Sequence, residues 1–159
     1  MITEIPSEES ITHDTKGLLR AGSDVFICLT HNDTESPYID SLTPQRISTI
    51  IAAEFAKHVD RVEIGLTDCK SNSAFGELPE FDFDYIIKPV LLGLSSSLNN
   101  SEISRNHIKL EVQIYAAESV KEFVSFTIEE VMTWHAIGIN HPCELIIEPL
   151  GRITAGLFT

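Results

Sequence analysis

Four residues near the end of the chain carry side chains that could bind a metal ion. His135, His141, Cys143 and Glu144 lie in the stretch TWHAIGINHPCE, and imidazole, thiolate and carboxylate groups are the usual ligands of zinc. Their order is H-x5-H-x-C, which matches no compact zinc pattern, and the sequence has no second CxxC or HxxxH pair to complete a tetrahedral set. Metal binding by His135, His141 and Cys143 is therefore a minority hypothesis, and it requires His31 or another distant donor.

The same stretch has a simpler structural interpretation. His141 and Pro142 are placed as the cap and the first residue of a helix, because proline is favoured at the first helical position. Glu144 then falls near the helix N-terminus, where its charge suits the helix dipole. Trp134 is expected to pack into the core, since a lone tryptophan usually buries its large side chain. The stretch is therefore predicted to be the loop between the last strand and the last helix, with no metal and no cofactor.

The rest of the sequence contains no arrangement typical of a catalytic site. It has neither the G-x-S-x-G nor a cysteine-protease signature, and no glycine-rich phosphate-binding loop. Of the three cysteines, Cys28, Cys69 and Cys143, the first lies in an apolar run and is predicted to be a buried small hydrophobe, so no disulfide framework is expected. The acidic cluster in GELPEFDFD lacks the spacing of a calcium loop. The sequence thus predicts a protein that is not an enzyme and has no catalytic residues.

The charge balance limits the partners. The chain has 24 acidic and 11 basic side chains, a net charge of −13, which repels phosphate backbones and anionic lipid head groups. Direct binding of nucleic acid is therefore disfavoured. The same charge would suit a basic protein, so a second hypothesis is an acidic cytoplasmic inhibitor, such as a phage-borne one, that imitates DNA. That hypothesis predicts carboxylates clustered on one face at phosphate-like spacing.

The sequence shows neither a membrane-spanning segment nor an export signal. No stretch approaches the roughly 18 apolar residues of a membrane span, and MITEIPSEES lacks the basic start and apolar core of a signal peptide. Read as complete, the chain is expected in the cytoplasm. Read as a mature fragment whose export signal was removed, it is expected outside the cytoplasm.

The first half of the chain predicts a strand, a helix and a second strand. Residues 1–16 are polar and acidic without apolar periodicity, so they are predicted to form a flexible leader before a single domain over residues 17–159. The run DVFICLT, residues 24–30, is typical of a strand covered on both faces. A helix is expected over 43–58, where a threonine cap and a proline precede apolar residues spaced by three and four. The alternating segment 60–66 predicts the next strand.

The second half predicts three more strands. The first covers residues 83–92, and Pro89 within it indicates a bulge or a sheet edge. Clean alternation of apolar and polar residues predicts an antiparallel hairpin from strands at 108–115 and 124–129. A rival interpretation makes 122–132 a helix, but its valine, phenylalanine, threonine and isoleucine in alternation favour a strand.

The chain is predicted to close with a helix over residues 142–158. Pro149 costs that helix one backbone hydrogen bond and should kink it or divide it in two. The serine- and asparagine-rich segment 95–106 is expected to be an exposed loop. The fold class is therefore α/β, a single mixed sheet of about five strands with two main helices packed on it.

Taken in order, these pieces resemble an uncharacterised family of small bacterial lipoproteins. The resemblance rests on Gly22-Ser23, on residues 62–65 and 84–89, on Trp134, on His141-Pro142 and on Pro149. The family's layout is similar to the amino-terminal domain of TolB and to the periplasmic domain of the curli secretion lipoprotein.

The resemblance implies a lipid-anchored protein on the periplasmic side of the bacterial envelope. It also implies a non-enzymatic domain that binds another protein, or further copies of itself, through a sheet edge or a helix face. The chain has no lipobox cysteine, so the anchor would lie in a removed segment, and the membrane would be reached only through it.

Overall fold

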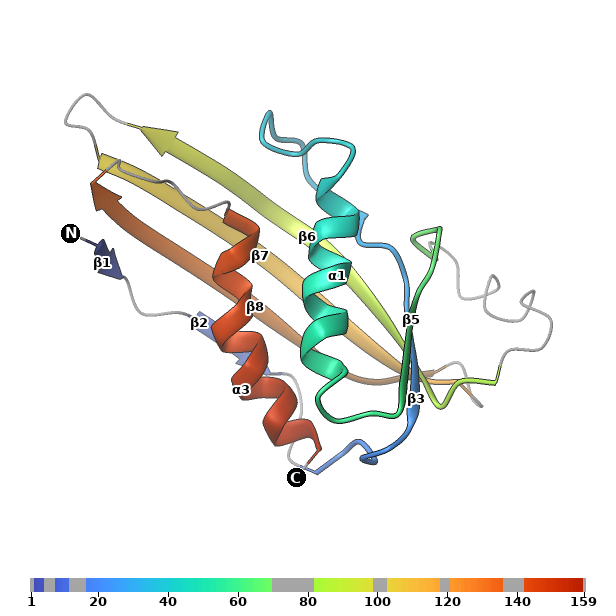
Figure 1. The fold of residues 1–159 in the computed structure, drawn as a ribbon. Helices are drawn as coiled ribbons and strands as arrows, with labels where there is room; N and C mark the ends of the chain where they lie inside the picture. The colour runs from blue at the N-terminus through green and yellow to red at the C-terminus, as the bar shows by residue number, and fades with distance from the viewer. Residues whose placement is uncertain are drawn as a thin grey trace.

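The apolar runs of the sequence form one mixed β-sheet, and two helices pack on the same face of it (Figure 1). The computed structural model describes residues 2–4, 8–11, 17–69, 82–98, 103–117, 121–135 and 142–158. In chain order the elements are β1 Ile2–Glu4, β2 Glu8–Ile11, β3 Asp24–Ile27, β4 His31–Asn32, α1 Thr43–Phe55, β5 Arg61–Ile64, β6 Tyr85–Leu98, β7 Ile103–Ala116, β8 Lys121–His135, η1 Pro142–Ile146 and α3 Ile147–Leu157. The strand order is β1-β8-β7-β6-β3-β5, with β2 also on β8 and β4 also on β6. The predicted fold class is confirmed, and the expected strands correspond to β3, β5, β6, β7 and β8.

Strand β3 lies inside the sheet. It runs parallel to both neighbours, with Val25 opposite Val62 of β5 on one side and opposite Tyr85 of β6 on the other. This position explains the continuously apolar sequence, because a strand covered on both faces has no face for polar side chains. The strand ends at Ile27, earlier than the predicted end at residue 30.

Helix α1 buries the predicted apolar stripe against the sheet, with Ile47, Ile51 and Phe55. Thr43, the predicted cap, is the first helical residue, and the cap position is Leu42, which makes no side-chain capping bond. Asp40 acts instead, because its Oδ1 accepts hydrogen bonds from the Leu42 N–H at 2.9 Å and from the Thr43 hydroxyl at 3.1 Å. Aspartate and threonine are both good capping types, so their order along the chain did not show which of them would act.

Strands β6, β7 and β8 form an antiparallel meander and are the longest elements, with 14, 14 and 15 residues. In β7 the side chains on the helix side are buried and apolar as predicted, among them Leu110, Val112 and Ile114. The strand interpretation of β8 is confirmed and the rival helix is excluded. The predicted loop 95–106 is wrong at both ends, because residues 95–98 pair with residues 104–107. The polar residues in this part of the β6–β7 pairing can form hydrogen bonds with each other. The Ser96 hydroxyl, for example, donates to the Asn106 side-chain oxygen at 2.6 Å.

Pro89 lies inside β6 at a point where no backbone donor is needed. The carbonyl of Ile87 accepts the N–H of Cys28 after β3, and the carbonyl of Leu91 accepts the N–H of Asp33 after β4. Because alternate residues direct their backbone groups to the same side of a strand, Pro89 faces the gap between these two pairings. The ladder with β7 shifts register just after Leu91, which is the irregularity that the proline predicted.

The two short strands at the start of the chain pair with β8 in antiparallel register. Ile2 lies opposite Trp134, and Ile11 lies opposite Phe126. Both strands fall within residues 1–16, the segment that the sequence predicted to be a flexible leader. These strands pair through backbone groups, which every residue has. The pairing therefore leaves no apolar periodicity in the sequence from which it could be predicted. The division of the chain into leader and domain stays a prediction.

The closing segment consists of the 3₁₀ helix η1 followed by α3, and the two meet at Ile146 and Ile147. Pro149 lies in the first turn of α3, where a missing N–H removes no helical hydrogen bond. The break therefore precedes the proline, whereas the sequence predicted it at the proline itself. η1 and α3 bury one face against the sheet beside α1, with Cys143, Ile146, Leu150, Ile153 and Leu157.

Candidate interaction surface

The predicted metal ligands are not brought together within the described part of the chain. The backbone of His135 ends β8 opposite Ile103, while its side chain, that of Trp134 and the whole of His141 lie outside the described residues. Cys143 is fully buried and Glu144 is exposed, so these two neighbours in the 3₁₀ helix point in different directions. The described residues contain no group of three or more His, Cys, Asp or Glu side chains placed to hold a metal ion.

The Cys143 thiol is held in its neutral form. Burial raises its pKa from 9.0 to about 11, and Asp40 and Glu144 add to the rise while Arg46 opposes it. A thiol must lose its proton to bind zinc, so this environment disfavours the ligand form at neutral pH. Metal binding at this stretch stays the minority hypothesis that its spacing suggested.

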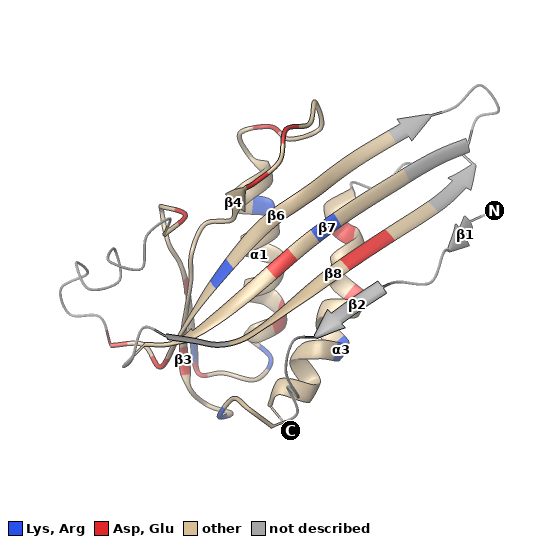
Figure 2. Cartoon of the chain, turned by 180° about the vertical axis from the view of Figure 1, so that it is seen from behind, with Lys and Arg blue, Asp and Glu red and all other residues tan. Residues whose placement is uncertain are grey.

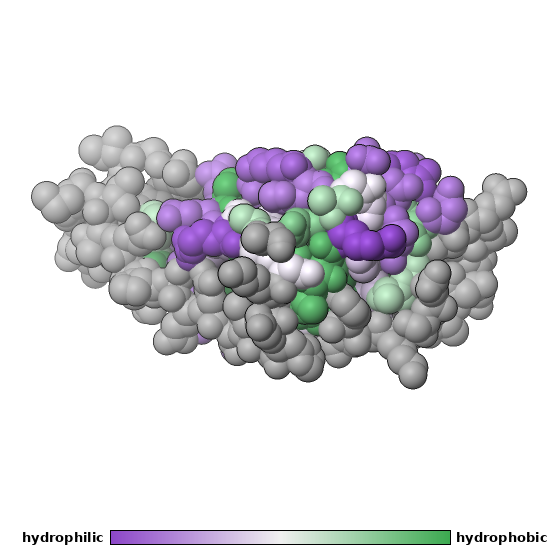
Figure 3. Space-filling view, turned by 90° about the horizontal axis from the view of Figure 1, so that it is seen from below, coloured by the Kyte–Doolittle hydropathy of each residue, from purple (hydrophilic) through white to green (hydrophobic). Residues whose placement is uncertain are grey.

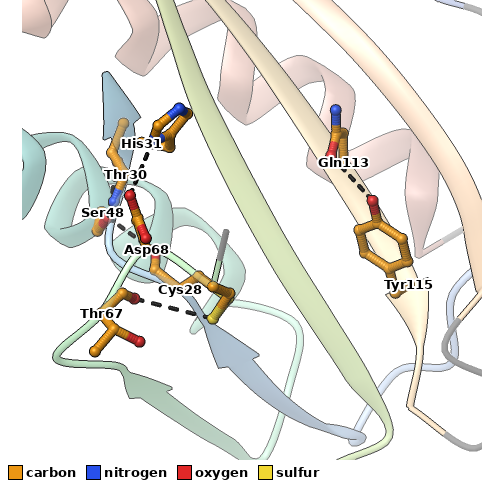
Figure 4. The surroundings of a disulfide bond; sticks show 9 residues. Cys28, Thr30, His31, Ser48, Thr67, Asp68, Gln113 and Tyr115 are labelled. Carbon is orange, nitrogen blue, oxygen red and sulfur yellow. Dashed lines mark hydrogen bonds and ion pairs between the residues drawn. A yellow bond between two sulfur atoms is a disulfide. The ribbon is translucent and has the colours of Figure 1, made fainter. Parts of the chain in front are cut away.

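A disulfide joins Cys28, directly after β3, to Cys69, which follows β5 (Figure 4). The two Cα atoms are 5.8 Å apart and the cysteines are 41 residues apart in sequence. The expectation of unpaired cysteines is wrong, because a buried small hydrophobe and half of a disulfide occupy the same kind of environment. The positions of the two cysteines could have predicted the bond. Both follow strands that were predicted to be neighbours, and the carboxyl ends of parallel strands meet at one edge of the sheet.

The disulfide belongs to a small second core on the sheet face that carries no helix. Ile86 and Tyr115 are buried around it, and Phe26 packs against them. Cys69 has a positive φ of 52°, which is unfavourable for a residue with a side chain. The bond to Cys28 therefore holds the chain after β5 in a conformation that it would not favour alone.

A histidine and an aspartate are paired next to the disulfide. His31 Nδ1 and Asp68 Oδ2 lie 2.8 Å apart (Figure 4). Both line a depression of about 630 Å³, together with Leu66 and Thr67. The pair thus links β4 to the segment after β5. This segment is therefore held both by the disulfide at Cys69 and by the contact of Asp68 with His31.

The nearby Ser48 of α1 is not presented to that histidine as a nucleophile. Its side chain is fully buried. Its hydroxyl oxygen accepts the N–H of Thr30 at 3.0 Å, and its hydroxyl contacts the carbonyl oxygen of Cys28 at 3.2 Å. Ser48 therefore ties helix α1 to the segment that follows β3.

The described residues include five large apolar side chains that are well exposed: Tyr38 at 44%, Leu42 at 58%, Ile64 at 36%, Leu66 at 94% and Ile147 at 44%. Leu42 and Ile147 line a depression of about 480 Å³ with Ile50, and Ile64 and Leu66 line another of about 270 Å³. Gln45 lines both depressions, so the two adjoin. We call Leu42, Ile50, Ile64, Leu66 and Ile147 the apolar band.

The apolar band is poor in charge. The residues that line its two depressions include one arginine, Arg46, and one glutamate, Glu144, and the other lining residues are uncharged. In a chain with a net charge of −13, a nearly neutral apolar surface is unusual. Contiguous exposed apolar patches mark interaction sites, and the centres of protein interfaces are depleted in charged residues. The sequence predicted the elements that carry this band but not which of their apolar residues would be exposed.

Strand β5 ends the sheet beside the apolar band (Figure 1). The N–H of Gly65 and the carbonyl of Thr67 bond to the neighbouring strand segment at 2.7 and 2.8 Å. By alternation along β5, the backbone groups of Val62 and Ile64 point away from β3. Leu66, in the bend after the strand, lies between Gly65 and Thr67 and continues this open side. No further strand pairs on that side among the residues that the structure describes.

Strands β6, β7 and β8 contain basic and acidic residues interleaved across the sheet, which Figure 2 shows from the side opposite the helices. His107 Nε2 lies 3.0 Å from Glu129 Oε2, and the Gln113 amide donates to Glu111 at 2.7 Å. Seen from below, the described hydrophobic residues form a central zone between hydrophilic side chains (Figure 3).

The chain matches no protein-family model, and no curated protein matches it in sequence. None of the helices that the structure describes is long and apolar enough to cross a membrane.

Similar folds are found among solved structures of bacterial proteins. A subunit of the PelC dodecamer from Paraburkholderia phytofirmans is 13% identical with a TM-score of 0.68, over 99% of this chain and 97% of that chain. The lipoprotein GNA1162 from Neisseria meningitidis is 12% identical with a TM-score of 0.54, over 84% and 98%. The protein XCC0632 from Xanthomonas campestris, assigned to DUF330, is 8% identical with a TM-score of 0.55, over 91% and 86%. The chain therefore has the fold of these bacterial proteins, one of which is described as a lipoprotein, and this agrees in part with the resemblance seen in its sequence.

Proposed function

We propose that the protein is a non-enzymatic interaction domain of the bacterial cell envelope that assembles with further copies of itself. The observation that carries the proposal is the similarity in fold, over almost the whole of both chains, to a subunit of the PelC dodecamer. The apolar band supports it, because a nearly neutral apolar surface is what copies of a strongly acidic chain need where they meet.

The disulfide supports the placement in the envelope. Disulfides persist in oxidising compartments such as the bacterial periplasm and are rare in the cytoplasm, and the bond between Cys28 and Cys69 lies in the folded core. The similarity of fold to the lipoprotein GNA1162 points the same way. A lipid anchor and a layout like that of TolB or the curli secretion lipoprotein remain predictions from the sequence.

Sedimentation velocity and native mass spectrometry of the oxidised protein test the self-assembly. We expect species that are multiples of the 17.7 kDa chain, and we expect their share to increase with added salt, because screening weakens the repulsion between acidic copies. A single species of 17.7 kDa at every concentration and ionic strength would refute self-assembly. Fractionation of cells that express the native gene tests the placement, and protein found only in the cytoplasm would contradict it.

A further inference from the structure

We infer that two copies of this chain meet by antiparallel pairing of their β5 edges. The inference rests on the proposed self-assembly and deepens it by naming the surface. Strand β5 ends the sheet on one side of the molecule (Figure 1). Its outward backbone groups belong to the apolar Val62 and Ile64, and the bend that follows it adds Leu66; Ile64 and Leu66 are exposed.

The open side of this edge presents the backbone groups of apolar residues. Natural proteins protect such edges with short strands, lysine, proline, bulges or charged side chains. Strand β5 is short and contains Arg61 and Glu63, but its outward backbone positions are the apolar Val62 and Ile64. Strand β5 also adjoins the part of the apolar band whose depression has no charged lining residue, so a second acidic copy can approach this edge.

Charge and the number of paired backbone groups both favour a two-fold axis at Ile64 over one at Glu63. A two-fold axis at Glu63 would place this carboxylate directly opposite the partner's Glu63, and like charges in that position are destabilising. A two-fold axis at Ile64 places Ile64 opposite the partner's Ile64 and leaves Glu63 opposite the partner's Gly65. The second register avoids the carboxylate pair, so we assign the axis to Ile64.

The Ile64 register also uses every outward backbone group. In an antiparallel pair, opposed residues of the hydrogen-bonded type exchange both of their N–H and C=O bonds. Val62 then bonds to the partner's Leu66, Ile64 to the partner's Ile64, and Leu66 to the partner's Val62. The same contacts cover Leu66, which is 94% exposed in the single chain. The disulfide at Cys69 and the His31–Asp68 pair hold the segment in place for this contact.

Three variants of the full oxidised chain test the surface by sedimentation equilibrium. Leu66→Asp places a carboxylate beside the partner strand, and Ile64→Pro removes the central outward N–H, a change that an edge strand tolerates. Each should raise the dissociation constant of self-association at least about tenfold, a conservative bound for a substitution at an interface centre. The control is Tyr38→Asp, another large exposed apolar residue that is not on β5, and it should leave the constant within about twofold. Thermal unfolding of each variant checks that the monomer is folded.

Oxidative cross-linking tests the register. The opposed residues of a hydrogen-bonded pair have Cα atoms about 5.5 Å apart, within the range of about 4.4 to 6.8 Å that a disulfide spans. Ile64→Cys should therefore form a covalent dimer, and Tyr38→Cys should not. A wild-type protein that stays monomeric would defeat the proposed self-assembly and this inference together. A wild-type protein that self-assembles while Leu66→Asp, Ile64→Pro and Ile64→Cys behave like their controls would defeat the inference alone.

Discussion

Reduction of the disulfide should lower the free energy of unfolding by about 4 kcal/mol. The bond between Cys28 and Cys69 closes a loop across 41 residues. Restricting a loop of this length in the unfolded chain removes about 13 cal/mol/K of entropy, which is about 4 kcal/mol at 25 °C. A domain of this size is stable by only about 5 to 15 kcal/mol, so the loss is a large part of the total.

Urea unfolding followed by tryptophan fluorescence measures the effect, in the oxidised protein and after reduction by dithiothreitol. With a typical slope of about 2 kcal/mol per molar urea, the midpoint should fall by about 2 M. Cys143→Ala serves as the control, because Cys143 is not part of the bond and its variant should keep the difference between the oxidised and reduced forms. Coincident curves for the two forms, with the disulfide shown by mass to be intact before reduction, would refute the reasoning.

The remaining predictions concern single side chains. Ser48→Ala leaves the buried N–H of Thr30 without its 3.0 Å partner, so the free energy of unfolding in urea should fall by about 1 to 3 kcal/mol. Ser48→Thr, which keeps the hydroxyl, is the control. Equal stability of Ser48→Ala and wild type would contradict the role of this hydrogen bond. Burial of the Cys143 thiol raises its pKa to about 11. Above about pH 9 the folded state therefore holds a proton that the unfolded chain releases, and the free energy of unfolding should fall as the pH rises. Iodoacetamide should label Cys143 in urea but not in the folded protein. The pKa of Asp40 is lowered by the Leu42 N–H first and then by the Thr43 hydroxyl. Its stabilising effect on the start of α1 should therefore be present above its ordinary value of 3.8 and be lost as pH falls through its lowered pKa; amide exchange in the first turn of α1 should rise in that range, and Asp40→Asn should weaken this pH dependence.

Local patterns predicted the interior of the sheet well. The alternation around Leu110 and Val112 and the stripe of Ile47 and Ile51 each reflect one buried face, which a single segment records in its own sequence. The mixed α/β class follows from the order of those segments. These features could be predicted because burial acts on each residue separately.

Features that depend on two distant segments could not be predicted in this way. The pairing of residues 2–4 and 8–11 with β8 uses backbone groups that every sequence has. The bond between Cys28 and Cys69 depends on the parallel order of two strands. The exposure of Leu66 could not be predicted from the sequence either, because an apolar residue after a strand usually enters the core.

The disulfide also closes residues 28–69 into a covalent ring that contains α1 and β5. The loop between β4 and α1 lies inside this ring, and its exposed Tyr38 is a site that chymotrypsin can reach. A cut there would open the backbone without releasing a fragment. On an electrophoresis gel the nicked chain should run as one band without reductant and as two bands with it. The edge of β5 would thus remain attached to the rest of the molecule after cleavage of the loop before α1.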